Sequence, residues 1–467
     1  MNNHINKRFI VVLACLFGLL AFVFFYKLGV HPLADYDESI YAQVAQESFL
    51  HHNQLGFTWL GNIGFYRSSV WFEKPPLMIW LIEANYKIFG INELAARLWP
   101  SIFAFATASF TFLFVLKIFK SLTAAVLSLA CYFIAFQFIY NAGVLQLDIP
   151  VTFFVLAALL CFWLSKESNK YFYLFWAALG LGLMTKSVIG LLPLPIIALY
   201  SLICRDWHYL KERTFWAGSL IFFAIVLPWH IIESLRYGKT FWNQYFSYHV
   251  FERYTKTLEG NKGDFLFYWR ILAEQRGLLY LGIPSLIYFF YKACKQKGEY
   301  LLVAISVLFI FLFFSLAKTK LTAYILVIYP FLIVLVSVTL DRMVDFIENK
   351  NAFIGRLCLW GGCAVMVFLG LRYNNYKLLK NQDPYFVASK TVGVYLKNNQ
   401  TLLPVYYYST GTSPEIIFYS NRTVYYLPYP SPKPTSEFLL ISRVKPDFLN
   451  AKMLISSGSS QSLYLIQ

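Results

Sequence analysis

The chain has 467 residues, of which 58% are hydrophobic and only 14% are charged. Soluble globular domains carry about a quarter charged residues, so this composition excludes an ordinary soluble protein and indicates an integral membrane protein. The net charge of +16 does not indicate nucleic-acid binding, because the basic residues recur in small groups between apolar runs. That distribution is typical of a multi-pass membrane protein with positively charged cytoplasmic loops.

The seven cysteines indicate neither a disulfide framework nor a zinc site. Most of them lie inside apolar runs, and the sequence contains no Cys-x-x-Cys pair. We expect them to pack as small apolar side chains.

The first apolar run follows Lys7 and Arg8 and extends from Phe9 to about Tyr26. It is long for the apolar core of a signal peptide, and no small-x-small cleavage site precedes Lys27. We expect an uncleaved helix whose N-terminus is cytoplasmic.

Acidic residues follow this helix directly. Asp35, Asp37 and Glu38 stand at the start of a segment, 37–50, whose apolar residues have helical spacing, so we expect a helix that lies along the membrane surface. Asp35 with Glu38 three residues later fits a capping box, and acids in a first turn complement the helix dipole. The spacing alone therefore leaves a structural and a catalytic role open for Asp37 and Glu38.

Some 35 residues later the sequence Glu73-Lys74-Pro75-Pro76 places an acid–base pair beside two prolines. A lysine near a membrane surface often extends to the headgroups, and a Pro-Pro pair begins a helix or stiffens a loop. The functional alternative is a cation that neutralises a lipid-linked phosphate at the outer interface. The apolar stretch at 77–90 is expected to lie at the interface.

Eleven apolar runs approach the roughly 20 residues that a membrane-spanning helix needs. Basic residues concentrate in alternate loops between them, which predicts a cytoplasmic N-terminus and a C-terminus on the outer side. Loops 28–96 and 233–270 then face outward. The expected spans are 9–27, 97–116, 122–141, 149–164, 171–184, 187–203, 214–232, 271–291, 300–317, 321–340 and 353–371.

Further ionisable residues fall on the predicted outer side. Asp148 stands at a helix entry, where it could simply cap the helix, and Lys186 lies in a two-residue turn. Loop 233–270 contains His249 and Arg253 among aromatic residues, which suits either a sugar or phosphate site or an interfacial aromatic belt. That these ionisable residues all fall on the predicted outer side of the membrane is stronger evidence for a functional site than any one of them alone. The residues on it are Asp37, Lys74, Asp148, Lys186, Arg253 and Lys320.

From Tyr373 onward, polar residues, Pro and Asn replace the long apolar runs. Two segments predict helices, 384–399 and 413–421. Short runs predict strands at 403–408, 423–427, 438–441 and 463–466. We therefore expect two domains, a transmembrane domain over 1–372 and a small α/β periplasmic domain over 373–467.

Several motifs together resemble the polyprenyl-phosphate-dependent membrane glycosyltransferases of the GT-C class, and most closely the bacterial aminoarabinose (lipid A) transferase and protein O-mannosyltransferase family. Their order and spacing fit from about residue 9 to 340. The matching segments are DESIYA at 37–42, WFEKPPL at 71–77, MTK at 184–186, LPWH at 227–230 and SLAKTKL at 315–321, followed by YIL at 324–326 and YP at 329–330. The resemblance implies a mainly α-helical polytopic membrane protein with about 11–13 transmembrane helices.

The resemblance also implies roles for individual residues. Asp37 matches the catalytic aspartate that takes or orients the acceptor proton, and Asp148, which matches a second acidic position, is also expected to be catalytic. Lys74 matches a lysine that contacts the donor phosphate. The remaining residues expected to bind the donor phosphate or sugar are Glu38, Tyr41, Glu73, Lys186, His249, Arg253, Lys320 and Tyr324.

The implied reaction is inverting transfer of a sugar from polyprenyl (undecaprenyl) phosphate to an envelope acceptor, at the periplasmic face of the bacterial inner membrane. Lipid A or a related glycolipid is the expected acceptor, and a protein is the alternative within the same family. No Gly-rich phosphate loop occurs, which agrees with a donor that is not a nucleotide sugar. No metal site is predicted; relatives differ in their use of a divalent cation, and the ligand set here is too thin to predict one.

Two other classes of function remain as alternatives. A lipid or sugar transporter would place ionisable groups near the bilayer midplane and show repeated halves, whereas the expected spans are nearly free of charge. A catalytically inactive sensor or scaffold with the same fold predicts that replacing Asp37 leaves the glycans of the cell unchanged.

Overall fold

The structure is a computed structural model of the chain. It describes residues 7–33, 36–62, 70–274, 276–380, 384–399, 401–408, 414–427, 437–442, 450–457 and 461–466. Asp35, expected as a helix cap, lies outside the described residues. The chain forms two compact units, and we describe each by itself. Unit 1 comprises Met1–Tyr26, Glu73–Leu77 and Pro100–Asn375, and unit 2 comprises Lys27–Phe72, Met78–Trp99 and Tyr376–Gln467.

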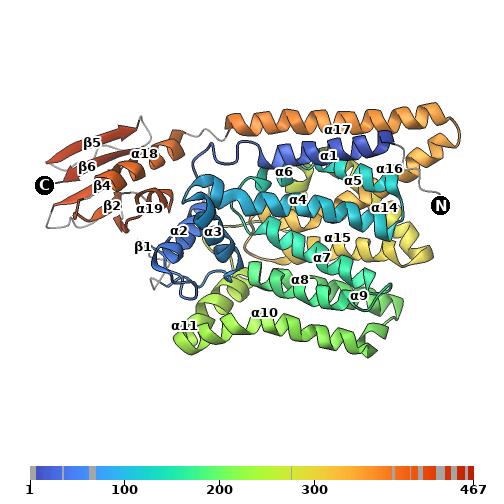
Figure 1. The fold of residues 1–467 in the computed structure, drawn as a ribbon, viewed down its shortest axis with the longest axis horizontal. Helices are drawn as coiled ribbons and strands as arrows, with labels where there is room; N and C mark the ends of the chain where they lie inside the picture. Colours follow the sequence, from blue (N-terminus) through green and yellow to red (C-terminus); the bar gives the residue numbers. More distant parts are fainter. Residues whose placement is uncertain are drawn as a thin grey trace. The chain divides into compact units, whose positions relative to one another are not determined.

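Unit 1 is a bundle of apolar helices, because a helix satisfies all of its backbone hydrogen bonds within one segment and is stable in lipid. Helices α7, α8 and α10 lie side by side (Figure 1). The helices wholly or mostly in this unit are α1 (Lys7–Phe25), α4 (Glu93–Ile118), α5 (Leu122–Tyr132), α6 (Phe136–Ala142), α7 (Asp148–Leu164), α8 (Tyr171–Lys186), α9 (Pro193–Cys204), α10 (Arg213–Tyr237), α11 (Lys239–Trp242), α12 (Arg253–Thr255), α13 (Phe267–Glu274), α14 (Arg276–Gln296), α15 (Glu299–Leu316), α16 (Tyr329–Glu348) and α17 (Ala352–Lys380).

Four short segments of other helix types connect these α-helices. They are the 3₁₀-helices η1 (Ser187–Leu191), η2 (His208–Lys211) and η4 (Thr322–Ile328), and the π-helix η3 (Asn243–Glu252). Three of them, η1, η3 and η4, contribute residues to the candidate site described below.

The expected spans correspond one for one to apolar helices or bent helix pairs. Within the described residues, six helices are long and apolar enough to cross a membrane, and two bent pairs would bring this to eight. The pairs are α5 with α6, bent by 69°, and α13 with the 278–296 part of α14, bent by 116°. The other three expected spans are apolar helices of 10–17 residues. The mainly helical, polytopic fold class is therefore confirmed.

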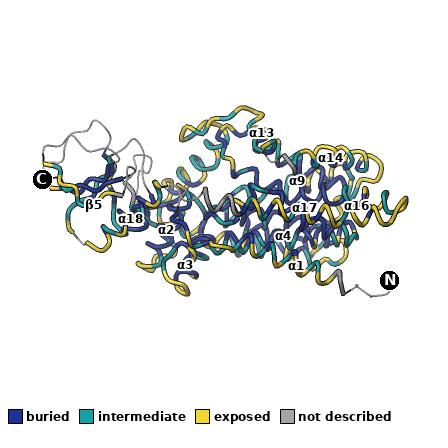
Figure 2. Tube along the Cα trace, turned by 90° about the horizontal axis from the view of Figure 1, so that it is seen from above, coloured by how far each residue is buried: buried dark blue, intermediate teal, exposed yellow. Residues whose placement is uncertain are grey.

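The helices of unit 1 differ in how deeply they are buried. The most apolar stretch of the segment 322–348, which includes α16, is 83% buried, whereas that of 352–374, in α17, is only 17% buried. Exposed stretches of α17 appear yellow in Figure 2. Because its exposed side chains are largely apolar, such as Leu357 and Phe368, this helix suits contact with lipid.

Unit 2 contains a six-stranded sheet with the order β1-β3-β2-β4-β6-β5. Strands β1 to β4 pair in parallel, and β6 lies antiparallel between β4 and β5. The strands are β1 (Gly61–Asn62), β2 (Val405–Tyr408), β3 (Val424–Leu427), β4 (Phe438–Ser442), β5 (Ala451–Ser457) and β6 (Gln461–Ile466). The four strands expected in this region are confirmed, as are both helices, α18 (Pro384–Asn398) and α19 (Pro414–Ser420).

Two strands of the sheet were not expected. Strand β5 lies at the sheet edge and ends in serines, so it lacks the apolar alternation that marks a half-buried strand. Strand β1 has only two residues and comes from the segment after α2 (Tyr36–His51), more than 340 residues before β2. Neither pairing has a local sequence signal.

Helix α2 is more enclosed than its apolar spacing indicates. Every residue from Glu38 to Ser48 is buried, and its expected position along the membrane surface stays a prediction. Tyr86 of α3 (Leu77–Phe89) packs on it, with its hydroxyl donating to the carbonyl of Ala42 at 3.2 Å. Helix α19 also contacts α2. Apolar spacing identified one buried face correctly, but other elements of unit 2 cover the polar face as well.

Candidate active site

A cavity of about 300 Å³ in unit 1 gathers several of the predicted site residues. Its walls come from the segment after residue 72, the start of α7, the junction of α8 with η1, the η3–α12 segment, the end of α15 and η4. The predicted residues on its wall are Glu73, Lys74, Asp148, Lys186, His249, Arg253 and Tyr324. Residues from six distant stretches of sequence therefore meet at one place.

Asp148 and Lys186 form an ion pair at one side of this cavity. Asp148 is the first residue of α7 and Lys186 the last of α8, and the Nζ–Oδ1 distance is 2.6 Å. The ammonium of Lys186 also lies 4.7 Å from the ring centroid of Tyr324. Because both side chains are largely buried, removing either would leave an uncompensated buried charge, which is strongly destabilising.

The turn after Lys186 is tightly packed. Gly190 of η1 approaches α8 so closely that an added Cβ would overlap the backbone carbonyl group of Gly182. Ser187 has φ of 47°, in the left-handed region that few non-glycine residues adopt. Close backbone contact therefore fixes where α8 ends and where Lys186 stands.

Glu73, Lys74 and His249 form a second charged group. Glu73 Oε1 lies 3.0 Å from Lys74 Nζ and 3.8 Å from His249 Nδ1. Burial alone would raise the pKa of Glu73, but the positive charges of Lys74 and Arg253 outweigh it and hold this pKa well below its usual range. Burial lowers the pKa of His249 to about 3, and Lys74 and Arg253 act in the same direction. At neutral pH, Glu73 is therefore ionised and His249 is neutral.

Arg253 joins the cavity from the η3–α12 segment. Its Nη1 donates to Tyr324 Oη at 3.2 Å and its Nη2 to Glu259 Oε1 at 2.7 Å. Burial opposes the charge, but Tyr324, Glu259 and Glu73 outweigh it and raise the pKa of Arg253, so it is cationic at any physiological pH. Its buried Nε has no hydrogen-bond acceptor among the residues that the structure describes.

Backbone hydrogen bonds hold this segment in place. The carbonyls of Arg253 and Tyr254 accept from the amides of Thr319 (3.3 Å) and Lys318 (2.9 Å). A side chain also contributes: Nε2 of Gln137 in α6 donates to the carbonyl of Thr322 at 2.6 Å, which fixes the start of η4. Arg253 and Tyr324 are therefore positioned by contacts that no sequence spacing shows.

Lys320 was predicted to bind substrate, but the structure places it differently. Its ammonium donates to the carbonyl oxygens of Phe314, Ser315 and Ala317 at 3.2, 2.7 and 2.8 Å. These carbonyls belong to the C-terminal end of α15, where a lysine satisfies unpaired acceptors and complements the helix dipole. Lys320 is 4% exposed and is not among the cavity residues.

Three further predicted residues, Asp37, Glu38 and Tyr41, belong to unit 2. The carboxylate of Glu38 forms two bonds with Arg97, 2.7 and 2.9 Å long. Tyr41 is buried, with its ring 6.0 Å from that of Trp71 in an edge-to-face arrangement. Asp37 lies half-buried in the first turn of α2.

Arg97 uses its remaining donors on the segment that precedes α2. It donates to the carbonyl oxygens of Leu28, His31 and Pro32 at 3.1, 2.7 and 2.7 Å. The Glu38–Arg97 pair therefore ties the start of α2 to this segment and supports the position of Asp37, its neighbour in sequence.

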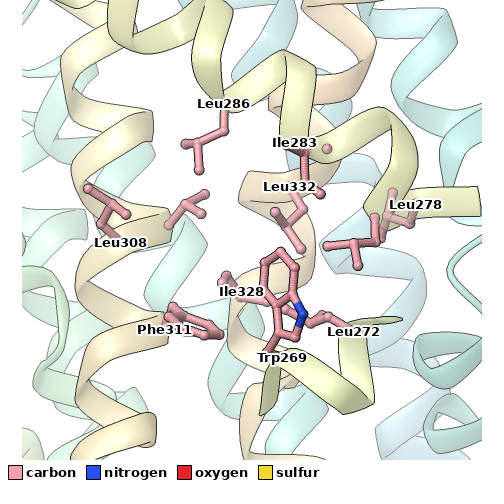
Figure 3. A pocket seen from close by; sticks show the side chains of 12 residues that line it. Trp269, Leu272, Leu278, Ile283, Leu286, Leu308, Phe311, Ile328 and Leu332 are labelled. Carbon is pink, nitrogen blue, oxygen red and sulfur yellow. The ribbon is translucent and has the colours of Figure 1, made fainter. Parts of the chain in front are cut away.

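A second, apolar cavity of about 180 Å³ lies between α13, α14, α15, η4 and α16. In Figure 3, the only non-carbon side-chain atom among its labelled residues is the indole nitrogen of Trp269. The two cavities share two elements: α15 contributes Phe311 to the apolar one and Phe314 to the charged one, and η4 contributes Ile328 and Tyr324 respectively. At a rise of about 2 Å per residue in a 3₁₀-helix, these last two positions lie about 8 Å apart along η4.

Sequence reasoning missed Ser187 and Thr319, which line the charged cavity, and Glu259, which pairs with Arg253. Ser187 follows a matched lysine but has no distinguishing residue type, and Glu259 lies in a loop without a motif. Thr319 was noted only as part of SLAKTKL. Within the described ranges, no group of three or more His, Cys, Asp or Glu side chains could hold a metal ion.

Comparison with known proteins agrees with this architecture. Residues 73–232 match the family model described as dolichyl-phosphate-mannose-protein mannosyltransferase. The chain is 27% identical to the undecaprenyl phosphate-alpha-4-amino-4-deoxy-L-arabinose arabinosyl transferase of Erwinia tasmaniensis, over 67% of this chain and 56% of that protein. It is 28% identical to the transferase of the same name from Pseudomonas savastanoi pv. phaseolicola, over 78% of this chain and 67% of that one.

Solved structures show the same fold. ArnT from Cupriavidus metallidurans, bound to undecaprenyl phosphate, superposes with a TM-score of 0.80 over 97% of each chain, at 17% identity. The oligosaccharyltransferase AglB from Archaeoglobus fulgidus gives a TM-score of 0.61 over 90% of this chain and 64% of that one, at 13% identity. At such identities the likeness establishes the fold.

These comparisons confirm two predictions from the sequence: the resemblance to this group of transferases and the GT-C fold. The expected enzyme class, a glycosyltransferase, is the class for which the matching family model and the named relatives are named. The matched region spans less than two thirds of some relatives, for instance 65% of an uncharacterised Aquifex aeolicus protein that is 28% identical. The donor, the acceptor and the roles of individual residues are therefore proposed below.

Proposed function

We propose that the chain transfers a sugar from a polyprenyl phosphate carrier to an acceptor of the bacterial envelope. The observation that carries this proposal is the convergence of Lys74, Lys186 and Arg253 on one cavity of unit 1. The relatives named above include proteins named for an undecaprenyl-phosphate-linked sugar, and one structural neighbour was solved with undecaprenyl phosphate.

The charged cavity suits the phosphate of such a carrier. Two of its cations are already paired with carboxylates, Lys74 with Glu73 and Lys186 with Asp148, which keeps them in place without a ligand. Arg253 is a third cation, and its buried Nε lacks an acceptor among the described residues. A phosphate oxygen would supply that acceptor, and charge-assisted bonds from arginine to phosphate are among the strongest in proteins.

The apolar cavity suits the hydrocarbon chain of the same molecule. It is lined almost wholly by Leu, Ile, Val and Phe, and it shares the elements α15 and η4 with the charged cavity. A ligand with an anionic head and an apolar chain would therefore find matching surroundings for both parts in unit 1.

The proposed reaction follows from these assignments. The acceptor oxygen attacks the anomeric carbon, the bond from that carbon to the phosphate oxygen breaks, and the acceptor proton passes to the carboxylate of Asp37. The phosphate leaves as a polyprenyl monophosphate, whose growing negative charge Lys74, Lys186 and Arg253 stabilise. Attack opposite to the leaving group inverts the anomeric configuration. We assign Asp148 to holding Lys186, and His249, Glu73 and Tyr324 to shaping the donor site.

We place the enzyme in the inner membrane, with a cytoplasmic N-terminus, a transmembrane domain over 1–372 and a periplasmic α/β domain over 373–467. The proposed acceptor is lipid A or a related glycolipid. The support for it is the resemblance to the aminoarabinose (lipid A) transferases, since the named relatives are named for transfer of 4-amino-4-deoxy-L-arabinose from undecaprenyl phosphate. Transfer to a protein is the second candidate, because the matching family model describes a protein mannosyltransferase.

Mass spectrometry of envelope glycolipids and glycoproteins, in cells expressing wild type or Asp37→Asn at matched levels, tests this proposal. Loss of a sugar-sized mass from one acceptor class in the variant is expected and would identify both sugar and acceptor. Lys318→Ala is the matched control, because this exposed lysine of the 317–320 loop is not on the cavity wall. Unchanged spectra with folded Asp37→Asn protein would exclude the catalytic role of Asp37 and favour a transporter or scaffold.

A further inference from the structure

A chain of hydrogen bonds leads from the carbonyl group of Val226 in α10, through His230 and Tyr245, to Ser187 on the wall of the charged cavity. Ser187 Oγ donates to Tyr245 Oη at 3.2 Å, and Tyr245 Oη lies 3.2 Å from Nε2 of His230. The other ring nitrogen of His230, Nδ1, lies 2.8 Å from the carbonyl oxygen of Val226. Ser187 lines the cavity beside Lys186, so the chain ends where the ligand is proposed to bind.

The carbonyl of Val226 fixes the direction of this chain. A carbonyl oxygen can only accept a hydrogen bond, so Nδ1 of a neutral His230 carries the hydrogen and Nε2 is the acceptor. Tyr245 then donates to His230, and its oxygen accepts from Ser187. The single hydroxyl hydrogen of Ser187 is thereby used, so towards a ligand in the cavity Ser187 Oγ can act only as an acceptor.

An oxygen with only lone pairs selects its ligand group. The oxygens of an ionised phosphate are also acceptors, so they gain nothing from Ser187, whereas a hydroxyl or amino group can donate to it. A site built to pair with such a group discriminates strongly against ligands that lack it. The sugar is the part of the proposed donor that carries these groups.

We propose that Ser187 is a specificity-determining residue that accepts a hydrogen bond from a hydroxyl or amino group of the donor sugar. This inference rests on the proposed function. Tyr245 and His230 are positioning residues, because they act only by holding the hydroxyl of Ser187 in its orientation.

The surroundings of the chain support a fixed orientation. Ser187 is held at φ of 47°, an unfavourable conformation for serine that tends to persist where the surrounding structure enforces it, often at functional sites. The ring of Tyr245 stacks on that of Phe241, with centroids 5.1 Å apart and planes within 7°, and meets the edge of Trp229. Packing on both sides leaves the phenol little freedom to turn away from Ser187.

The test compares binding of bare undecaprenyl phosphate with undecaprenyl phosphate linked to a pentose, an aminopentose or a hexose. Purified wild type is expected to bind at least one sugar-linked lipid about 10-fold more tightly than the bare lipid. Ser187→Gly should remove most of this advantage and leave affinity for the bare lipid within about 2-fold, since glycine accepts the positive φ without strain. Tyr245→Phe, which frees the serine hydrogen, should reduce the advantage by a smaller factor of about 3.

Thermal unfolding of each variant in detergent checks that it is folded. Equal weakening of bare and sugar-linked lipids by Ser187→Gly would show a merely structural role and overturn the proposal. It is also overturned if Ser187→Gly keeps the full advantage, or if no sugar-linked lipid binds wild type better than the bare one. Failure of wild type to bind bare undecaprenyl phosphate would instead contradict the proposed function.

Discussion

Two buried ion pairs that involve predicted site residues differ in what surrounds them. In unit 2, Glu38 and Arg97 form two mutual bonds, and Arg97 spends its other donors on three backbone carbonyls. In unit 1, Asp148 and Lys186 form their pair on the wall of a cavity that also holds Lys74 and Arg253. The first pair ties backbone segments together, while the second places a charge on the wall of a cavity. Matching a family motif therefore does not by itself distinguish a binding residue from one that holds the fold.

The largest effect is expected from breaking the first pair. Arg97→Met leaves the buried carboxylate of Glu38 unpaired and three carbonyls without a donor, a loss of about 3–5 kcal/mol for the charge alone. We expect little folded protein after detergent extraction, measured by size-exclusion chromatography and thermal unfolding. A variant with near wild-type unfolding temperature would refute the structural role of this pair.

Replacing Arg253 at the charged cavity is expected to affect folding less than Arg97→Met does, but to weaken ligand binding strongly. Arg253→Ala should weaken undecaprenyl phosphate binding by about 100-fold, since it removes a cation together with the charge-assisted bond proposed for its Nε, worth about 2–3 kcal/mol. Arg253→Lys keeps the charge but not the planar fork and should recover part of the affinity. Titration with the lipid by native mass spectrometry measures both. If the alanine variant bound as tightly as Lys318→Ala, the phosphate site would lie elsewhere.

His249 gives a pH-dependent prediction. Its folded pKa of about 3 lies below the usual value near 6.5, so the unfolded chain binds a proton between these values and the folded chain does not. Stability therefore falls as pH decreases below about 6.5, by roughly 1 kcal/mol per unit. Glu73, with its lowered pKa, adds a loss only at more acidic pH, as pH falls below about 4.5.

Thermal unfolding at pH 7 and pH 5 tests this prediction. Wild type should lose about 1–2 kcal/mol more stability than His249→Gln over this interval. The same pH sensitivity in both proteins would show that His249 is protonated in the folded state.

The smallest effect is expected at the apolar cavity. An added Cβ at Gly282 would meet no atom within 4 Å, although the glycine lines the cavity. Gly282→Leu should therefore fold and fill part of the space, weakening undecaprenyl phosphate binding by about 5-fold. Affinity for a short-chain prenyl phosphate should change less. Equal effects on both lipids would place the prenyl chain outside this cavity.

The sequence predicted much of the fold because apolar runs and charge alternation are local signals. Each expected span is an apolar helix or bent pair, and four strands were located within about two residues. The pairing of β1 with β3 and the enclosure of α2 depend on distant contacts, which local periodicity cannot show.

The candidate site was predictable to a similar extent and for a related reason. Lys74 and Lys186 lie in matched motifs, and Asp148 was expected from its position at a helix entry on the outer side. The structure brings all three to one cavity with Arg253, for which no firm motif exists. Lys320 carried an equally clear motif but caps α15. Charge and position suggest a site, but only the contacts of each side chain separate binding from support.

A structure of the protein with undecaprenyl phosphate bound, determined by electron cryo-microscopy, tests the central claim most directly. We expect the phosphate within hydrogen-bonding distance of Lys74, Lys186 and Arg253, and the first prenyl units along α15 towards the apolar cavity. A phosphate bound away from all three cations would contradict the account.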